Sequence, residues 1–374
     1  MGEGLSVLAI DVGTTRIKVG HVLASGTLAS SRSYPSPDTW SELLDVVESA
    51  VRDAEQIPYS HLALTGRMAH AMLLDRKGRE IAMSRPPRQP PGAALDPEGT
   101  LERRTGYGPD APSLRSWWWE AQQSGTVDLG SVGAILPIKD WLLWRLGAEP
   151  GTDLASAASL GLRRTTEGEE GWDGPLLDRL GVDPSALPAI EAPGAPAGQL
   201  RPDLARGRRV ILVRGSGDGV TGSLGVSDLE RGASYINLGT HGVYRVAADR
   251  SLRRAQFSYP TGLGGVLCGV VIPDLGARLA QGIQDTGSWD ARARDLLAPF
   301  VRWHHALERE LGPGLPPPRL MGGAADTAVG RVLARELDRA VWLMPPEPTL
   351  IGAARLAKGM GLRPAAPGVV LAPG

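Results

Sequence analysis

The chain has 374 residues, 42% of them hydrophobic and 22% charged, so it can form one large domain or two, each with a buried core. A formal net charge of −1 gives no overall attraction to nucleic acid or anionic lipid, and the single cysteine, Cys268, excludes an internal disulfide or a cysteine metal cluster. Without a recognisable signal peptide or a window of about 18 apolar residues, we expect a cytoplasmic protein without a membrane or nucleic-acid partner.

The first predicted elements form a β-hairpin, a helix and a third strand. The hairpin strands are 7–10 and 17–23, where apolar residues alternate with small or polar ones. The helix is expected over 41–55, because leucines and valines recur there at helical spacing, and Ser41 is its expected N-cap. The strand 61–66, "HLALTG", ends at a glycine turn.

The sequence of the middle of the chain predicts an irregular segment, two helices and a linker. Residues 85–108 are rich in Pro, Gly and Arg, which predicts an irregular segment, and "SWWWEAQQ" and "KDWLLWRLG" predict aromatic-rich helices. The segment 191–207 is dense in Pro, Gly and Ala, and the apolar strand "RRVILVRG" follows it. We therefore expect two domains, 1–207 and 208–374.

An internal repeat supports this division. The segment 233–247, "ASYINLGTHGVYRVA", has the design of the first hairpin: an apolar strand, a polar residue, Gly-Thr and a second apolar strand. Two such hairpins, one on each side of the expected linker, predict a duplicated nucleotide-binding domain.

The Gly-Thr turn of the first hairpin has the chemistry of a phosphate site. Glycine lets backbone N–H groups approach an anion closely, and threonine hydroxyls add donors. Gly13, Thr14 and Thr15 supply these groups, with Lys18 or Arg16 as a nearby cation.

Two acids stand beside glycine-rich turns. Asp11 cannot bind a phosphate directly, but it can hold Mg²⁺, which bridges a carboxylate and a phosphate; the alternative is that it caps the turn. Asp218 lies in "VRGSGDGVTGSLG", directly after a strand. It is placed to act as a general base towards a substrate hydroxyl, and the alternative is an ordinary Asp-Gly turn.

A third glycine turn lies in "RLMGGAADTAVGRVLAREL". Small residues at Gly322, Gly323 and Ala324 allow a flat ring to lie against the backbone where a helix begins. Asp326 is the expected N-cap of that helix, and it could also contact an adenine or ribose. This segment contains neither the dinucleotide fingerprint nor the P-loop pattern.

In this order, the motifs resemble those of the FGGY carbohydrate kinases. "AIDVGTTRIKVGHV" is similar to the first phosphate loop of that family, and "INLGTHGVY" to its second. "ALTGRMAHAMLLDRKG" resembles its substrate turn, "GSGDGVTGSLG" its catalytic loop, and "MGGAADT" with "PTLIGAARLAKGMG" its adenosine-binding and C-terminal segments. "ILPIKDWLLWRLG" and "EEGWDGPLLDRLG" are also similar to family segments, so the resemblance covers most of the chain.

The resemblance implies an α/β fold of two ribonuclease-H-like (actin-like) domains with a nucleotide cleft between them. It implies ATP and Mg²⁺ as cofactors, Asp218 as the general base, and Asp11 and Asp218 as the metal-linked carboxylates. The other site residues that it implies are Gly13, Thr14, Thr15, Lys18, Gly239, Thr240 and Gly242 for phosphate, Gly322, Gly323, Ala324 and Asp326 for adenosine, and Arg67, Met68 and His70 for substrate.

The chain departs from the family pattern at the substrate turn. Ala69 stands where family members carry a polar sugar contact, and His70 is one place late. The family segment that holds substrate hydroxyls has no clear counterpart, and Arg85 or Arg88 could substitute for it. About fifty residues separate Cys268 from Arg319, which is a much shorter stretch than in the family.

We therefore expect a kinase that phosphorylates a hydroxyl of a small sugar or polyol, with a homodimer left open. The alternative is a nucleotide- or sugar-binding protein that keeps the scaffold with weakened catalysis. The short stretch before Arg319 and Ala69 favour that alternative, whereas Asp11, Asp218 and the two Gly-Thr turns favour the kinase.

Overall fold

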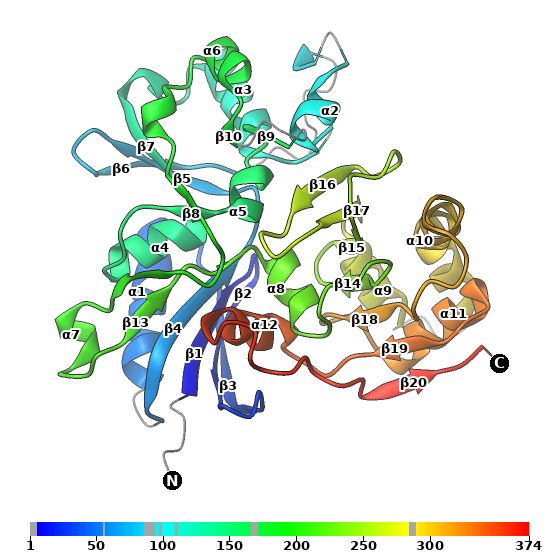
Figure 1. Cartoon of the computed structure of the whole chain (residues 1–374). Coiled ribbons are helices and arrows are strands. Elements are labelled where there is room, and N and C mark those ends of the chain that lie inside the picture. The colour runs from blue at the N-terminus through cyan, green and yellow to red at the C-terminus, as the bar shows by residue number, and fades with distance from the viewer. Residues whose placement is uncertain are drawn as a thin grey trace. The chain divides into compact units, whose positions relative to one another are not determined.

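The computed structural model describes residues 6–54, 57–85, 94–96, 99–108, 111–165, 171–283 and 289–373. Its contacts divide the chain into two units, each built around one large mixed β-sheet (Figure 1). Unit 1 comprises Met1–Gly222, Tyr259–Gly264 and Thr349–Arg363, and unit 2 comprises Ser223–Ser258, Gly265–Pro348 and Pro364–Gly374. The boundary expected after residue 207 falls inside unit 1.

The large sheet of unit 1 has the strand order β12-β13-β4-β1-β2-β3. Its strands are β1 (Ser6–Val12), β2 (Arg16–Val22), β3 (Leu28–Pro35), β4 (Tyr59–Gly66), β12 (Pro196–Gln199) and β13 (Ile211–Val213). β1 pairs antiparallel with β2 and parallel with β4, as the predicted hairpin and third strand require. The predicted linker is wrong at 196–199, because this stretch forms β12 and pairs with β13.

Helices cover both faces of this sheet. They are α1 (Trp40–Asp53), α4 (Ile138–Leu146), α7 (Pro202–Ala205) and α12 (Pro348–Ala357). Alternate residues of β1 point to opposite faces, so Leu8 and Ile10 pack in the core with α1 and α4, whereas Val7 and Ala9 pack with α12. Every residue of β1 is therefore buried, which explains its nearly continuous apolar sequence.

The N-cap of α1 differs from the prediction. Thr39 has extended backbone dihedral angles, and its hydroxyl accepts a hydrogen bond from the backbone N–H of Glu42. Ser41 lies inside the first turn, because the helix already begins at Trp40. The side chain of Glu42 in turn accepts a hydrogen bond from the Thr39 hydroxyl, 2.7 Å away, which adds to the stability of this helix start.

A smaller lobe of unit 1 follows β4. Its sheet contains β5 (Ala71–Asp75), β6 (Glu80–Met83) and β7 (Val132–Pro137), and its helices are α2 (Leu101–Thr105), α3 (Leu114–Ser124), α5 (Leu154–Ser159) and α6 (Gly174–Leu180). Two short strand pairs, β8 (Thr152–Asp153) with β11 (Ile190–Glu191) and β9 (Arg163–Arg164) with β10 (Gly171–Trp172), complete it. Leu73, Trp118 and Leu177 lie in its core, where α3 and α6 cover the sheet (Figure 1).

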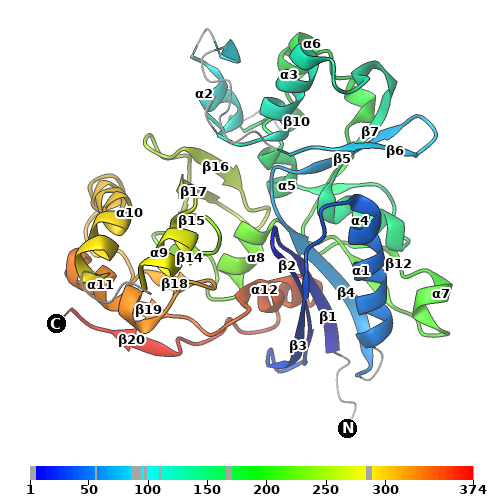
Figure 2. The ribbon, with the colours of Figure 1, turned by 180° about the vertical axis from the view of Figure 1, so that it is seen from behind.

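The sheet of unit 2 has the order β16-β17-β15-β14-β18-β19-β20. Its elements are β14 (Ser234–Leu238), β15 (Gly242–Ala248), β16 (Phe257–Pro260), β17 (Val266–Ile272), α9 (Leu275–Ile283), α10 (Trp289–Leu311), β18 (Arg319–Met321), α11 (Thr327–Leu337), β19 (Val341–Leu343) and β20 (Val369–Leu371). Figure 2 shows α9, α10 and α11 together beside this sheet. Cys268 is fully buried in the same core, as expected of a structural cysteine.

The two large sheets have the same topology. In unit 1, β3-β2-β1 are antiparallel neighbours and β4 and β13 continue the sheet in parallel from β1. In unit 2, β17-β15-β14 are antiparallel neighbours, and β18 and β19 continue in parallel from β14. The predicted duplication is therefore confirmed in the fold.

No helix in the described part of the chain combines the length and the apolar character that a membrane span needs.

Candidate active site

The turn of the first hairpin is narrow and open to solvent. The backbone N–H of Gly13 donates to the carbonyl of Arg16 across 3.0 Å, and a Cβ on Gly13 would lie 2.7 Å from that oxygen. Thr14 and Thr15 are exposed at the tip of the turn. Lys18 is half-buried and faces Asp11 across the hairpin. The proposed phosphate donors are thus accessible, and glycine is required where the chain turns back.

Asp11 is close to the end of β1, and its side chain is largely shielded from solvent. It is 7% exposed. Its Oδ2 accepts a hydrogen bond from the hydroxyl of Thr349, in the first turn of α12, across 2.8 Å. This contact holds the carboxylate in one orientation at the edge of the sheet.

Three parallel strands of unit 1 bring the predicted catalytic and substrate residues to one edge. Val12 pairs with Gly66, and Gly66 forms a parallel bridge with Gly217, the residue before Asp218. The N–H of Arg67 donates to the carbonyl of Val12 across 3.0 Å. Ligands of open α/β sheets bind beyond the carboxyl ends of the strands, which is where these residues lie.

The loop that carries Asp218 is held by close backbone contacts. A Cβ on Gly215 would lie 1.6 Å from the carbonyl oxygen of Leu64, so only glycine fits there. The hydroxyl of Thr65 donates to the carbonyl of Ser216 across 2.9 Å. Asp218 itself is half-buried and begins α8 (Asp218–Leu224). The backbone that leads into Asp218 is therefore held by the strand beside it.

Helix α12 packs closely on α8. A Cβ on Gly352 would lie 1.8 Å from the carbonyl oxygen of Thr221. The hydroxyl of Thr221 is also 2.6 Å from that of Thr65, so α8 is tied to both α12 and β4. Because α12 also carries Thr349, one helix contacts both Asp11 and the helix that begins at Asp218.

A buried network of charged side chains, which was not predicted from the sequence, adjoins the loop that carries Asp218. Lys139 Nζ is 2.7 Å from Asp140 Oδ1 and 3.0 Å from Asp153 Oδ1, and all three side chains are almost fully buried. Arg214 lies 3.5 Å from Asp140. The hydroxyl of Ser216 donates to Asp153 across 2.6 Å, which connects the network to the Asp218 loop.

The network favours the charged forms of Lys139 and Asp153, whereas burial raises the pKa of Asp140. Burial would lower the pKa of Lys139, but Asp140 and Asp153 outweigh it and raise that pKa. Burial would raise the pKa of Asp153, but Lys139 and hydrogen bonds from two serines hold it below its usual value. The sequence does contain one indication of this network, the Lys139-Asp140 pair inside an apolar run. A helix with such a sequence is buried, so its charged side chains need partners of opposite charge.

The predicted substrate turn has an unusual backbone. Ala69 adopts a left-handed conformation, with φ of 67°, and its N–H donates to the Ser159 hydroxyl across 3.0 Å. His70 Nδ1 donates to the carbonyl of Met68 across 2.9 Å. Burial, together with the charges of Arg67 and Arg85, lowers the pKa of His70 to about 4, so its ring is neutral at pH 7. Arg88 lies outside the described residues.

In unit 2, the second Gly-Thr turn is also exposed at its tip. Gly239 and Thr240 are exposed between β14 and β15. A Cβ on Gly242 would lie 2.3 Å from the Leu275 side chain, so this glycine serves close packing. The N–H of Asp274 donates to Nδ1 of His241 across 3.0 Å.

The Gly322-Gly323 turn lies beside it in the same unit. The N–H of Ala324 donates to the carbonyl of Leu238 across 2.9 Å, at the end of β14. Gly322 has a φ of 107°, which favours glycine. Asp326 caps α11 as predicted, because its carboxylate accepts from the N–H of Val329 across 2.8 Å.

The described residues hold no group of three or more His, Cys, Asp or Glu side chains suited to a metal ion. That is compatible with Mg²⁺, which is usually held by one or two carboxylates together with substrate phosphates and water. Asp11 provides one buried, oriented carboxylate at the strand edge, so the donor set fits that mode of binding.

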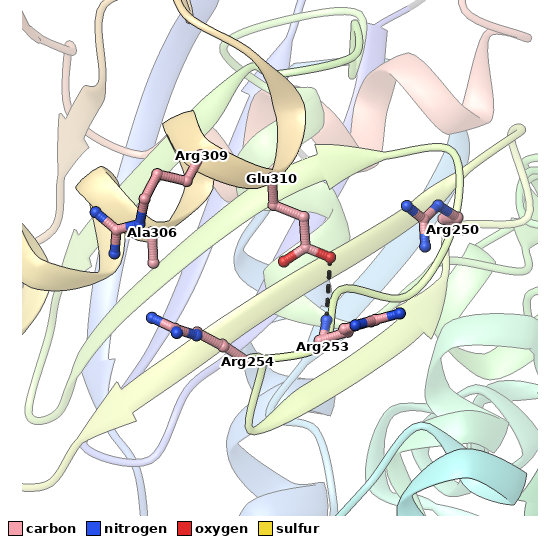
Figure 3. A pocket seen from close by; sticks show the side chains of 6 residues that line it. All are labelled: Arg250, Arg253, Arg254, Ala306, Arg309 and Glu310. Carbon is pink, nitrogen blue, oxygen red and sulfur yellow. Dashed lines mark hydrogen bonds between the residues drawn. The ribbon is translucent and has the colours of Figure 1, made fainter.

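An open pocket of about 430 Å³ lies elsewhere on unit 2 (Figure 3). Its lining residues are Arg250, Arg253, Arg254, Ala306, Arg309 and Glu310. The carboxylate of Glu310 accepts a hydrogen bond from the backbone N–H of Arg253. None of the predicted site residues lines this pocket, so it contributes nothing to the candidate active site.

Comparison with known proteins finds sequence similarity to carbohydrate kinases. No protein-family profile matches the chain. It is 26% identical over 278 residues to a xylulose kinase from Klebsiella pneumoniae, which covers 67% of this chain and 56% of that protein. It is 24% identical over 266 residues to a glycerol kinase from Halothermothrix orenii, covering 63% and 53%. The chain thus spans about half the length of these sequence relatives.

Solved structures share the fold over nearly the whole chain. A gluconate kinase from Lactobacillus acidophilus matches with a TM-score of 0.83 at 16% identity, covering 99% of this chain and 94% of the other. A glycerol kinase from Plasmodium falciparum, solved with ADP, matches with a TM-score of 0.80 at 13% identity, covering 100% and 95%. These matches confirm the predicted α/β fold of two actin-like domains.

Proposed function

We propose that this chain, which belongs to the FGGY carbohydrate kinases, transfers the γ-phosphoryl group of ATP to a hydroxyl of a small sugar or polyol. One observation carries the proposal: the bridge between Gly66 and Gly217 sets Asp218 beside the substrate turn. Asp11 is at the same edge, because β1 is the next strand. A binding protein would need neither a base at that position nor a second carboxylate beside it.

In the proposed reaction, Asp218 accepts the proton of the attacking hydroxyl. The substrate oxygen forms a bond to the γ-phosphorus, the bond from that phosphorus to the bridging oxygen breaks, and ADP leaves. Asp218 is half-buried, so it can face substrate while its loop is fixed by Gly215 and Ser216. Positioning of this kind is the main contribution a protein makes to phosphoryl transfer.

Phosphate and adenosine binding are assigned by the same proposal. Gly13, Thr14, Thr15 and Lys18 bind phosphate in unit 1, and Gly239 and Thr240 do so in unit 2, with Gly242 supporting the second turn. The small residues of the Gly322-Gly323 turn receive adenosine. Asp11 would hold Mg²⁺, which neutralises phosphate charge when bound. The hydroxyl of Thr349 orients Asp11 for this task.

The experiment measures ADP release from Mg-ATP with a panel of polyols, aldoses and ketoses. Asp218→Asn keeps the shape of the side chain and removes the base, so we expect at least about a 10³-fold loss of kcat, with ATP affinity unchanged. Asp45→Asn, at an exposed position on α1, is the matched control and should retain activity. If ATP binds and no substrate stimulates ADP release, the chain is a nucleotide-binding protein on a kinase scaffold.

A further inference from the structure

The guanidinium group of Arg67 is only weakly satisfied by the protein. Arg67 is half-buried directly after β4. Its Nη2 lies 3.7 Å from the sulfur of Met83, which is a weak acceptor, and its buried Nε has no hydrogen-bond partner among the described residues. In the described part of the chain, no carboxylate lies within ion-pair distance of it. This half-buried cation therefore lacks the acceptors that normally accompany a buried guanidinium N–H.

A second arginine increases the positive charge at this turn. Arg85 follows β6, is exposed, and donates to the backbone carbonyl of Asp38. Burial lowers the pKa of Arg67, and the charge of Arg85 lowers it further, while the exposed carboxylate of Asp38 acts in the opposite direction. Both arginines also lower the pKa of His70, which leaves that ring neutral. Arg67 and Arg85 are therefore two cations that act on each other, and the exposed Asp38 offsets this only in part.

A bound anion would remove two unfavourable contributions to the free energy of this turn, the unsatisfied Arg67 donor and the repulsion between Arg67 and Arg85. Burying a charged donor without an acceptor is unfavourable, and two neighbouring like charges repel. Sugar hydroxyls could accept hydrogen bonds from Arg67, but they would leave the repulsion between Arg67 and Arg85 unchanged. A carboxylate both accepts hydrogen bonds from the planar guanidinium and neutralises charge.

The surroundings of Arg67 indicate substrate rather than nucleotide. The side chain extends to Met83 on β6, in the lobe that follows β4. The proposed phosphate donors are at the tip of the β1–β2 hairpin instead, around Thr14 and Thr15. The side chain of Arg67 thus contacts the strand that leads to Arg85, whereas its backbone N–H donates to Val12, the residue before the predicted phosphate turn.

We propose that the substrate is a polyhydroxylated carboxylic acid of the aldonate type, with its carboxylate bound by Arg67 and Arg85. This inference rests on the proposed function. Arg67 and Asp218 each follow one glycine of the Gly66–Gly217 bridge, so the two side chains begin at neighbouring points of one edge. The negative charge of Asp218 repels the carboxylate end and attracts a hydroxyl, which orients the substrate with a hydroxyl at the base.

The test uses matched pairs that differ only in the acid group: D-gluconate against D-glucitol, and a five-carbon aldonate against its alditol. For the wild-type protein we expect kcat/KM at least about 30-fold higher for the acid of each pair. Arg67→Gln should lower kcat/KM for the acid about 100-fold, mainly through KM, and lower kcat/KM for the alditol by a much smaller factor. Arg85→Gln should have a smaller effect, because Arg85 is exposed. Arg52→Gln, on the surface of α1, should have none.

Binding without turnover is measured in parallel, by calorimetry with each acid and each alditol. Phosphorylation of alditols or ketoses without phosphorylation or binding of aldonates overturns the inference and leaves the proposed function intact. If aldonates bind in an Arg67-dependent way but no substrate is phosphorylated, the proposed function fails and the acid site stands.

Two other results also overturn the inference. The first is a rise in KM for ATP, and not for the acid, in Arg67→Gln, which would assign Arg67 to the nucleotide. The second is that a sugar phosphate binds more tightly than any aldonate and that this binding depends on Arg67. That result would assign the site to phosphate instead of carboxylate.

Discussion

The hydroxyl of Thr349 donates a hydrogen bond to Oδ2 of Asp11 across 2.8 Å, although the two residues are 338 positions apart in the sequence. Thr349 is in the first turn of α12, and Asp11 is near the end of β1. Helix α12 returns to unit 1 from the far end of the chain and packs against Val7 and Ala9 of the same strand. The orientation of a proposed catalytic carboxylate therefore depends on the last helix.

Replacing Thr349 should impair the use of Mg²⁺ without unfolding the protein. Thr349→Val keeps the shape and removes the donor, so we expect about a tenfold loss of kcat/KM and a higher Mg²⁺ concentration at half-maximal activity. Thr349→Ser should retain most activity because it keeps the hydroxyl. The measurement is a Mg²⁺ titration of ADP release, with the exposed Thr126→Val as control. Identical Mg²⁺ curves for Thr349→Val and wild type would contradict the assignment.

Lys139 should be required both for stability and for activity. Lys139→Met leaves Asp153 buried without its cation and Asp140 with Arg214 alone, which should cost about 3–5 kcal/mol in the free energy of unfolding. Asp153 would then hold Ser216 less firmly, so kcat should fall even in molecules that remain folded. Urea unfolding and single-temperature kinetics measure the two effects.

The control for Lys139 is Lys77→Met, at an exposed position. It should change neither quantity by more than about 0.5 kcal/mol or twofold. A cost below about 1 kcal/mol for Lys139→Met would show that the buried network contributes little to stability.

Replacing two glycines of the proposed site by alanine should change the stability of the protein by very different amounts. A Cβ at Gly215 would meet the Leu64 carbonyl at 1.6 Å, so Gly215→Ala should destabilise the protein by about 3 kcal/mol or more. A Cβ at Gly323 meets nothing within 4 Å, so Gly323→Ala should leave stability within about 0.5 kcal/mol of wild type. Thermal and urea unfolding of both variants give the comparison. Equal stabilities would contradict the close approach at Gly215.

Stability should fall in acid as buried histidines are forced to accept protons. His304 is fully buried and contacts Tyr244, and burial, with a contribution from Arg339, lowers its pKa from 6.5 to about 4. Between those values the unfolded chain binds more protons than the folded one, so stability decreases as pH falls from about 6.5 to 4. The pKa is lowered in the same direction at His21, His61 and His70.

The contribution of His304 to this loss should reach about 3 kcal/mol. His304→Asn keeps a polar atom near Tyr244 and cannot titrate, so its unfolding free energy should depend less steeply on pH. His305→Asn, at an exposed position on the same helix, should leave the slope unchanged. Urea unfolding at several pH values between 7.5 and 4.5 measures the slopes, and equal slopes for His304→Asn and wild type would refute the assignment.

Two variants of Asp326 distinguish a structural role of its side chain from a role in binding adenosine. Asp326→Ala should lose about 1 kcal/mol of stability, because α11 loses its cap, whereas Asp326→Asn should retain most of it. If Asp326 also contacts adenosine, both variants should raise KM for ATP. Unfolding and kinetics on the same samples distinguish the two roles, and an unchanged KM in both variants would leave only the cap.

Much of the fold was predictable because it is encoded locally. The hairpin β1–β2, strand β4 and the cap at Asp326 depend on alternation, glycine turns and short polar side chains within a few residues. The predicted linker failed because Pro and Gly are also compatible with a short edge strand, which β12 turned out to be. Ser41 failed as a cap because two hydroxyl residues lay near the helix start, and only the backbone angles select Thr39.

The sequence by itself determined the order of the motifs and the residue types at the proposed site. Only the tertiary structure decided that Asp11, Arg67 and Asp218 share one sheet edge, since parallel pairing of β1, β4 and β13 joins segments far apart in the chain. It alone also decided that Thr349 orients Asp11, that Lys139 supports the Asp218 loop and that Arg67 lacks strong acceptors. Such contacts depend on burial and distance, which local patterns do not specify.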